Sequence, residues 1–204
     1  MLLLLATTNP NKILEIRAVM SNGDVRLQTL ADFDPLGEPD ETATSFEGNA
    51  RLKAVAYASA LGPRLAADTL VVAEDSGLVV DALDGDPGVR SARFLRPDAS
   101  YGERFSEIYR RMALRPDAPR VARFVCAVAV ANRDASIVFE TTGRVEGRIA
   151  DAPAGGHGFG YDPIFFYPPL GRTLAEVSDD EKRTASHRGQ AFGALATWLA
   201  NPAY

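Results

Sequence analysis

The chain of 204 residues has few of the residues that mark several classes of protein. A single cysteine, Cys126, cannot form an intrachain disulfide, and this favours a reducing, cytoplasmic environment. The neighbours of Cys126 are all apolar, which is typical of a packed thiol and not of a nucleophile. Two histidines are too few for a multi-histidine zinc site, so oxygen atoms are the expected metal ligands.

Long apolar segments and an excess of basic residues are also missing. No run approaches the ~20 apolar residues of a membrane span, and the apolar start ends at Thr7 without the basic region of a signal peptide. The 22 basic and 27 acidic residues leave a net charge of −5, which argues against binding to nucleic acid. A phosphate-rich ligand would therefore need local positive charge or a metal ion.

What is present is the composition and patterning of a globular α/β protein. With 46% hydrophobic and 24% charged residues, residues 1–204 suit one large domain or two lobes that share a core. Strands are predicted at residues 2–6, 70–73, 78–80, 122–131 and 137–142, and helices at residues 10–20, 46–61, 101–112, from 179, and 187–200. The short polar connection at residues 132–135 favours an antiparallel hairpin, and residues 152–171 are predicted to form a long loop around an apolar run. Ser178 and Glu181 have the spacing of a capping box, which predicts a helix start there. The predicted architecture is a mixed central sheet flanked by helices.

The first candidate site joins the first predicted strand to the first predicted helix, at residues 7–12 (Thr-Thr-Asn-Pro-Asn-Lys). Asn9 is a good N-cap, and Pro10 suits the first helical position. A helix N-terminus presents free N–H groups and the positive end of the helix dipole, which suits a phosphate, and Lys12 adds a full charge. No Walker glycine pattern is present, and a capped helix with a solvated lysine explains the same residues.

The second candidate site is Glu74-Asp75-Ser76-Gly77, which follows a predicted buried strand. We expect a turn here, made tight by Gly77. Two adjacent carboxylates at the end of a strand are well placed to hold Mg²⁺, which needs only one or two protein carboxylates. Ser76 could hydrogen-bond a phosphate oxygen, whereas a plain Asp-Ser-Gly turn is the alternative interpretation.

Three other segments carry polar or glycine-rich patterns. A carboxylate from the acidic residues 38–41 would complete a metal site if it lay near Asp75, although acids in a loop are usually solvated. Residues 155–163 combine many glycines with two aromatic residues, which indicates either backbone close to a flat ligand or a flexible lid. Lys182, His187 and Arg188 lie near helix starts, where they could donate to base or phosphate oxygens or simply cap a helix.

Taken in order, these segments resemble the inosine triphosphate pyrophosphatase family, the non-standard purine nucleoside-triphosphate pyrophosphatases. The resemblance is carried by residues 6–12, 45–54, 73–78, 85–93, 158–165 and 186–189, which run nearly end to end. It implies an elongated α/β fold of two lobes with a substrate cleft between them, a homodimer and dependence on Mg²⁺. It also implies hydrolysis of ITP, dITP and XTP to the monophosphate and pyrophosphate, which cleanses the nucleotide pool.

The resemblance assigns roles to individual residues. The triphosphate-binding segment maps to Thr7, Thr8, Asn9, Pro10, Asn11 and Lys12. Asp75 maps to the general base and, with Glu41, to the metal ligands. Base and sugar contacts map to Ser76, Phe159, Gly160, Tyr161, Asp162, Lys182, His187 and Arg188.

The chain departs from the family pattern at two positions. Gly48 stands where the family commonly has Glu, with Glu47 one place earlier, and Glu74 stands where the family usually has Asp. The expected base, Asp75, is retained. Which acids share the metal with it stays open among Glu41, Glu47 and Glu74.

The residues also suggest how the purine base could be selected, and they leave two alternative functions open. Donors aimed at the 6-oxo group of hypoxanthine or xanthine would reject adenine, and His187 and Arg188 are the candidate donors. A related pyrophosphatase for pyrimidine or modified nucleotides would use the same phosphate and metal groups. A nucleotide-binding sensor without turnover is the other rival, and the retained Asp75 and Lys12 argue against it. The ranking of ITP, dITP and XTP does not follow from the sequence.

Overall fold

The computed structural model describes residues 1–21 and 25–201. These residues form two compact units. The first unit holds the described parts of residues 1–75, 126–143 and 187–204, and the second holds residues 76–125 and 144–186. The cleft between two lobes, which the resemblance implies, stays a prediction.

Seven strands form one sheet in the order β2-β1-β3-β4-β5-β6-β7. Their bounds are β1 Leu2–Leu5, β2 Arg26–Thr29, β3 Thr69–Val80, β4 Val121–Ala131, β5 Ile137–Ile149, β6 Phe165–Tyr167 and β7 Arg172–Thr173. β1 is parallel to β2 and β3, whereas β6 is antiparallel to β5 and β7. The predicted mixed sheet is therefore confirmed, together with the α/β class.

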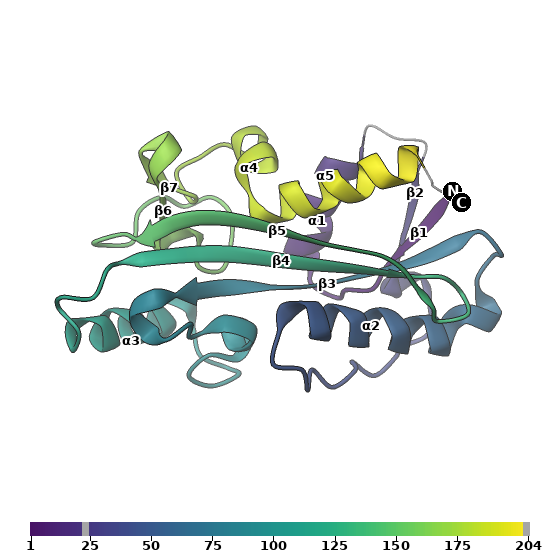
Figure 1. Cartoon of the computed structure of the whole chain (residues 1–204), viewed down its shortest axis with the longest axis horizontal. Helices are drawn as coiled ribbons and strands as arrows, with labels where there is room; N and C mark the ends of the chain where they lie inside the picture. The colour runs from purple at the N-terminus through teal and green to yellow at the C-terminus, as the bar shows by residue number, and fades with distance from the viewer. Residues whose placement is uncertain (22–24, 202–204) are drawn as a thin grey trace. The chain divides into compact units, whose positions relative to one another are not determined.

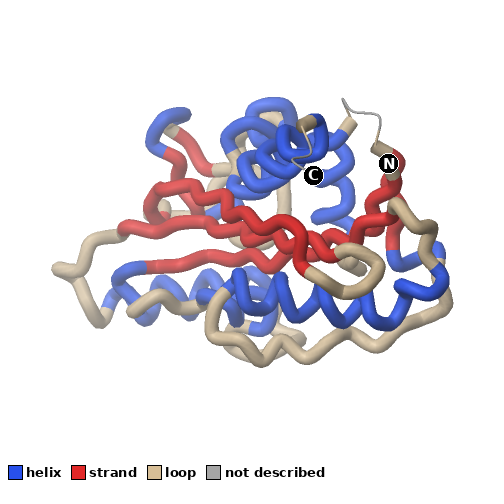
Figure 2. Tube along the Cα trace, turned by 45° about the vertical axis from the view of Figure 1, so that its right-hand side comes forward, coloured by secondary structure: helices blue, strands red, loops and turns tan. Residues whose placement is uncertain are grey.

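The first unit surrounds the amino-terminal strand with helices. α2 (Phe46–Leu61) covers one face of its strands, and α1 (Pro10–Met20) and α5 (His187–Ala200) lie together on the other face (Figures 1 and 2). The apolar run of β1 is needed because both of its faces are covered. The core of this unit includes Leu3, Leu5, Ile16, Met20, Val72, Val128, Val130, Phe192 and Leu195.

The second unit has its own apolar core, and two helices belong to it. α3 (Tyr101–Ala113) buries Phe105, Ile108 and Met112, as its spacing predicts, while Tyr101 at its start is 38% exposed. α4 (Asp179–Ala185) begins with the predicted capping box, since Ser178 and Glu181 bond to each other's backbone N–H. No described helix is long and apolar enough to cross a membrane.

The predicted turn at residues 74–77 is wrong, because β3 runs without interruption from Thr69 to Val80. The two carboxylates that indicated an exposed turn are buried and have polar partners inside the first unit, so a buried strand accommodates them. Gly77 is needed for close approach: a Cβ there would lie 2.3 Å from Ser91 Oγ and 2.7 Å from the Gly88 carbonyl oxygen.

The hairpin is longer than predicted. β4 and β5 are neighbours in the sheet, as expected, but β5 continues to Ile149 beyond the predicted end at Thr142. Two glycines lie in the added length. A Cβ on Gly143 would lie 2.0 Å from the His187 carbonyl oxygen, and one on Gly147 would lie 2.5 Å from a carbonyl oxygen of β6. These glycines serve close packing and do not end the strand.

Three short strands were not predicted. β2 has four residues and β7 has two, and each lies at an edge of the sheet. Strands this short show too little alternation of apolar and polar residues to be recognised from the sequence. β6 lies within the predicted loop 152–171, at its apolar run. Tertiary pairing, and not local pattern, makes these segments strands.

Candidate active site

β3 places its two central acids on opposite faces of the sheet. Glu74 and Asp75 are consecutive residues of a strand, so their side chains point to opposite sides. Both are buried, with 3% and 5% of their surface exposed. Asp75 accepts a hydrogen bond from α2, and Glu74 forms ion pairs with residues of α1 and α5. α2 lies on one face of the sheet, and α1 and α5 lie on the other (Figure 1).

Asp75 is held by two residues one helical turn apart on α2. Asn49 Nδ2 donates to Asp75 Oδ2 at 3.1 Å, and the Asn49 amide oxygen accepts from the Ala43 N–H at 3.0 Å. Lys53 Nζ lies 3.4 Å from Asp75 Oδ1 and 2.9 Å from Glu41 Oε1. One ammonium group therefore bridges Asp75 and Glu41, the two acids that the resemblance maps to the metal ligands.

Charge and burial around Asp75 favour the chemistry expected of it. Burial raises the pKa of Asp75; Lys53 opposes this shift and Glu41 adds to it. Burial would lower the pKa of Lys53, but Asp75 and Glu41 outweigh it and raise that pKa. A buried carboxyl group with a raised pKa is a reasonable general base.

The acid pair also fits a magnesium ion. The Lys53 ammonium is a cation within 3.4 Å of both carboxylates, so the position between them already accepts positive charge. Within residues 1–21 and 25–201, no group of three or more His, Cys, Asp and Glu side chains could hold a metal. Mg²⁺ commonly takes one or two carboxylates and completes its shell with phosphate oxygens and water.

On the opposite face of the sheet from Asp75, Glu74 forms ion pairs with two basic side chains. Lys12 Nζ lies 2.5 Å from Glu74 Oε1, Arg188 lies 3.2 Å from Oε2, and the Cys126 thiol donates to Oε2 at 3.2 Å. Burial would raise the pKa of Glu74, but Arg188 and Lys12 outweigh it and hold that pKa well below its usual value. Glu74 is therefore suited to fix these cations and not to share a metal with Asp75.

The structure separates the three acids left open by the sequence. Glu41 shares the Lys53 ammonium with Asp75. Glu47 accepts a hydrogen bond from the Thr142 hydroxyl at 3.3 Å and is exposed. This distribution supports Glu41 as the acid that acts with Asp75.

The predicted phosphate segment begins α1, and its N-cap is confirmed. The Asn9 side chain accepts from the N–H groups of Asn11 at 3.0 Å and Lys12 at 3.3 Å. Thr7 accepts from the Asn9 N–H, and the Thr8 hydroxyl donates to Glu38 at 2.7 Å. The exposed helix start thus lies next to Lys12, with two of its amides held by the cap.

In the second unit, the glycine-rich segment folds around an ion pair. Lys182 Nζ lies 2.6 Å from Asp162 Oδ2, which also accepts from the Phe159 N–H at 2.8 Å. The ammonium lies 5.0 Å from the centre of the Phe159 ring. Gly158 has φ of 71°, and a Cβ there would lie 2.2 Å from Asp162 Oδ2, so the pair itself requires glycine.

The two predicted stacking residues differ in burial. Tyr161 is buried, donates to the Ser91 carbonyl oxygen at 2.9 Å and packs edge-on against Tyr101. Burial raises the pKa of its hydroxyl. Phe159 is half-buried and follows Gly158 in the loop, so its ring is the better candidate for stacking on a base.

Four other residues were predicted to contact the base or the sugar: Ser76, Gly160, His187 and Arg188. Ser76 is half-buried in β3, Gly160 has φ of 67°, and His187 is buried at the start of α5. Arg188 is 2% exposed, and its two terminal nitrogens lie against Glu15 and Glu74. Direct contact between Arg188 and a base would require these ion pairs to open.

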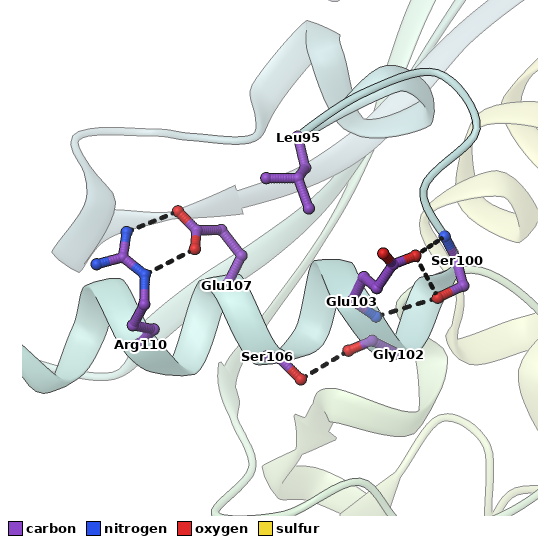
Figure 3. Close-up of a pocket in the computed structure, with 7 residues that line it drawn as sticks. All are labelled: Leu95, Ser100, Gly102, Glu103, Ser106, Glu107 and Arg110. Carbon is purple, nitrogen blue, oxygen red and sulfur yellow. Dashed lines mark hydrogen bonds and ion pairs between the residues drawn. The ribbon is translucent and has the colours of Figure 1, made fainter.

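A surface hollow in the second unit, of about 540 Å³, is lined by none of the predicted site residues (Figure 3). It is lined by Leu95, Ser100, Gly102, Glu103, Ser106, Glu107 and Arg110. Hydrogen bonds from Arg96 lower the pKa of Glu103 to about 2, and those from Arg110 and Arg111 lower that of Glu107 to about 2. Both acids are ionised and engaged, so the hollow offers no acid–base group.

Asn49, Lys53 and Glu15 are site residues to which no sequence pattern assigned a role. Composition could have pointed to Lys53, because lysine is rare in this chain. Only three of the 22 basic side chains are lysines, namely Lys12, Lys53 and Lys182. Each of them pairs with a buried or half-buried carboxylate of the candidate site. Asn49 and Glu15 carry no such signal, because only folding brings them to Asp75 and Arg188.

Known proteins are similar in sequence to this chain along nearly its whole length. A dITP/XTP pyrophosphatase of an Exiguobacterium species is 42% identical over 195 residues, which cover 96% of this chain and 95% of that protein. One from a Nostoc species is 42% identical over 199 residues, with 98% and 94% covered.

Two solved structures are similar over equal lengths. A HAM1 protein from Coxiella burnetii has a TM-score of 0.87 and 34% identity, with 98% of each chain covered. A nucleoside-triphosphatase, a dITP/XTP pyrophosphatase, from Mycobacterium abscessus has a TM-score of 0.72 and 39% identity, with 98% of this chain and 99% of that chain covered. The sequence profile of the Ham1 family matches residues 3–198, so the chain belongs to the Ham1 family.

Proposed function

We propose that this protein hydrolyses dITP, XTP and ITP to the nucleoside monophosphate and pyrophosphate. The observation that carries the proposal is the buried Asp75, fixed by Asn49 and joined to Glu41 through the Lys53 ammonium. The Exiguobacterium and Nostoc relatives, described as dITP/XTP pyrophosphatases, support the same reaction.

Asp75 acts as the general base. It takes a proton from water as that water attacks the α-phosphorus, and pyrophosphate leaves. Asn49 holds one carboxylate oxygen, so the other faces Lys53 and Glu41. Asp75 and Glu41 would hold a Mg²⁺ ion, which would neutralise charge on the phosphates. Lys12 and the start of α1 stabilise phosphate oxygens, and Glu74 holds the lysine in place.

Base recognition uses other residues. In the second unit Phe159 stacks on the base, and the Lys182–Asp162 pair sets its ring and loop. In the first unit His187 is the candidate donor to the 6-oxo group, and Arg188 is a second candidate if its ion pairs open. If Arg188→Ala hydrolysed ITP and ATP in the wild-type ratio, this role of Arg188 would be wrong.

The test is pyrophosphate release from ITP, XTP, dITP, GTP, ATP and a pyrimidine set, with Mg²⁺ and with EDTA. We expect Mg²⁺-dependent release from the first three and little from GTP and ATP. For ATP the reason is that a donor facing the adenine amino group can discriminate by about 10⁴. Guanine keeps the 6-oxo group, so GTP must be rejected through its 2-amino group instead. Preference for pyrimidine or modified nucleotides would support the rival pyrophosphatase. Tight ITP binding with no release from any substrate would support the non-catalytic sensor.

We further propose that the protein is a cytoplasmic homodimer. The single cysteine is buried and needs no oxidising compartment. The resemblance supports the dimer. Light scattering on the purified protein tests it, and a monomer mass at micromolar concentration would contradict it.

A further inference from the structure

Lys53 places its ammonium group within reach of both proposed metal ligands. Its ammonium lies 2.9 Å from Glu41 and 3.4 Å from Asp75, and its side chain is 13% exposed. Asn49, one turn earlier on α2, holds the other oxygen of Asp75. Asp75 therefore cannot turn away from Lys53 without losing a second hydrogen bond.

The Glu41 and Asp75 carboxylates share the Lys53 ammonium group in a mostly buried place. Without any cation the two acids would repel each other and lose their hydration as well. A divalent ion in place of the ammonium would balance both carboxylates, so exchange of the two cations is electrostatically reasonable.

We propose that Lys53 acts as a built-in counter-ion that holds Glu41 and Asp75 ready for the metal and competes with it, so that a divalent ion enters only as the ammonium leaves. This inference rests on the proposed magnesium site. It makes Lys53 a positioning residue that sets how tightly the nucleotide-free protein binds metal.

The exchange couples metal binding to the binding of anions. An anion that accepts the displaced ammonium lowers the cost of displacing it, so metal and anion bind more tightly together than alone. Thermodynamic linkage requires this coupling to be reciprocal. Removal of the ammonium should therefore tighten the binding of metal alone and weaken its coupling to pyrophosphate.

The experiment measures Mn²⁺ binding by electron paramagnetic resonance at about pH 8, where carboxylates are ionised. The proteins are the wild type, Lys53→Met and Lys53→Arg, without nucleotide and with pyrophosphate. An opposite charge this close shifts a carboxyl equilibrium by about tenfold to a thousandfold, so we expect Lys53→Met to bind Mn²⁺ at least about tenfold more tightly. Lys53→Arg should stay as weak as the wild type.

The matched control is Arg51→Met on the same helix. Arg51 is 55% exposed and pairs with Glu140, away from the two acids. Its loss changes the net charge equally, so unchanged Mn²⁺ affinity would show that the effect of Lys53 is local. Equal or weaker Mn²⁺ binding by folded Lys53→Met would overturn the inference.

A second measurement uses the wild type and needs no variant. The chain has three lysines, so acylation of each amine can be followed by mass spectrometry. Saturating Mg²⁺ should speed the labelling of Lys53 and leave Lys182, paired with Asp162, unchanged. Unchanged labelling of Lys53 would contradict the exchange. Pyrophosphate release assayed in parallel separates the two claims, because the proposed reaction can hold while the competition fails.

Discussion

The two faces of β3 at residues 74 and 75 carry the same kind of side chain in opposite electrostatic settings. Glu74 meets Lys12 and Arg188, and its pKa lies well below the usual value. Asp75 meets one lysine and a second acid, and its pKa is raised. We therefore propose that the contacts from α1 and α5 give Glu74 a structural role, and that those from α2 give Asp75 a chemical one.

The difference shows why an acidic pair in a sequence need not be a two-ligand metal site. Alternation along a strand sends adjacent side chains to different neighbours. The balanced face fixes Lys12 and Arg188, while the acid-rich face keeps a group that can accept a proton or a metal.

The largest effect is expected on the Asp75 face. Asp75→Asn keeps the shape and the place of the side chain but cannot accept a proton, so turnover should fall by about 10²–10⁴. Steady-state pyrophosphate release measures it, with circular dichroism to confirm the fold. Near-normal turnover would show that another group is the base.

Glu74→Gln should instead damage stability. It leaves the Lys12 ammonium without this carboxylate and Arg188 with Glu15 alone, and loss of one partner of a buried pair costs about 3–5 kcal/mol. Urea unfolding measures the change. Glu140→Gln on exposed β5 is the control and should behave like the wild type. Equal unfolding curves for Glu74→Gln and the control would contradict the structural role.

Asn49→Ala should have an intermediate effect on both properties. Asp75 loses a buried hydrogen bond and the Ala43 N–H loses a partly buried one, at a cost of about 1–3 kcal/mol in stability. Turnover should fall by up to about a hundredfold because Asp75 is no longer oriented. A stability loss with unchanged turnover would show that Asn49 does not position the base.

The two faces should also respond oppositely to pH in the metal-free protein. Because the folded-state pKa of Asp75 is raised, the native protein binds more protons than the unfolded chain, and this contribution to stability is lost as pH rises through the raised value. The pKa of Glu74 is depressed, so its contribution is lost as pH falls through the depressed value.

The direction of this pH dependence can be tested by measuring the free energy of unfolding in EDTA over a pH series. Asp75→Asn should be less destabilised than the wild type as pH rises above the ordinary Asp range, since the neutral amide has no charge to bury. If both proteins follow the same curve, the raised pKa of Asp75 is wrong.

The smallest effect is expected at Cys126. Burial, and then the charge of Glu74, raise the pKa of its thiol well above the usual value. A thiol reagent should therefore fail to label the folded protein near neutral pH and label it fully in denaturant. Rapid labelling of the native protein would contradict this burial.

Several elements follow from local sequence alone. The N-caps at Asn9 and Ser178, the long helix at residues 46–61 and the apolar β1 are confirmed, because capping and periodicity act within a few residues. The turn at residues 74–77 is wrong, because adjacent acids and a glycine look exposed until their distant partners are known.

The sequence by itself determined the α/β class and the family resemblance, and through the resemblance it named many of the candidate site residues. Only the tertiary structure decided how those residues divide the work. It brought Lys53 and Asn49 to Asp75, and Lys12 and Arg188 to Glu74, from segments up to 114 residues away. The environment of a buried acid is set by such contacts, and short-range sequence patterns do not encode them.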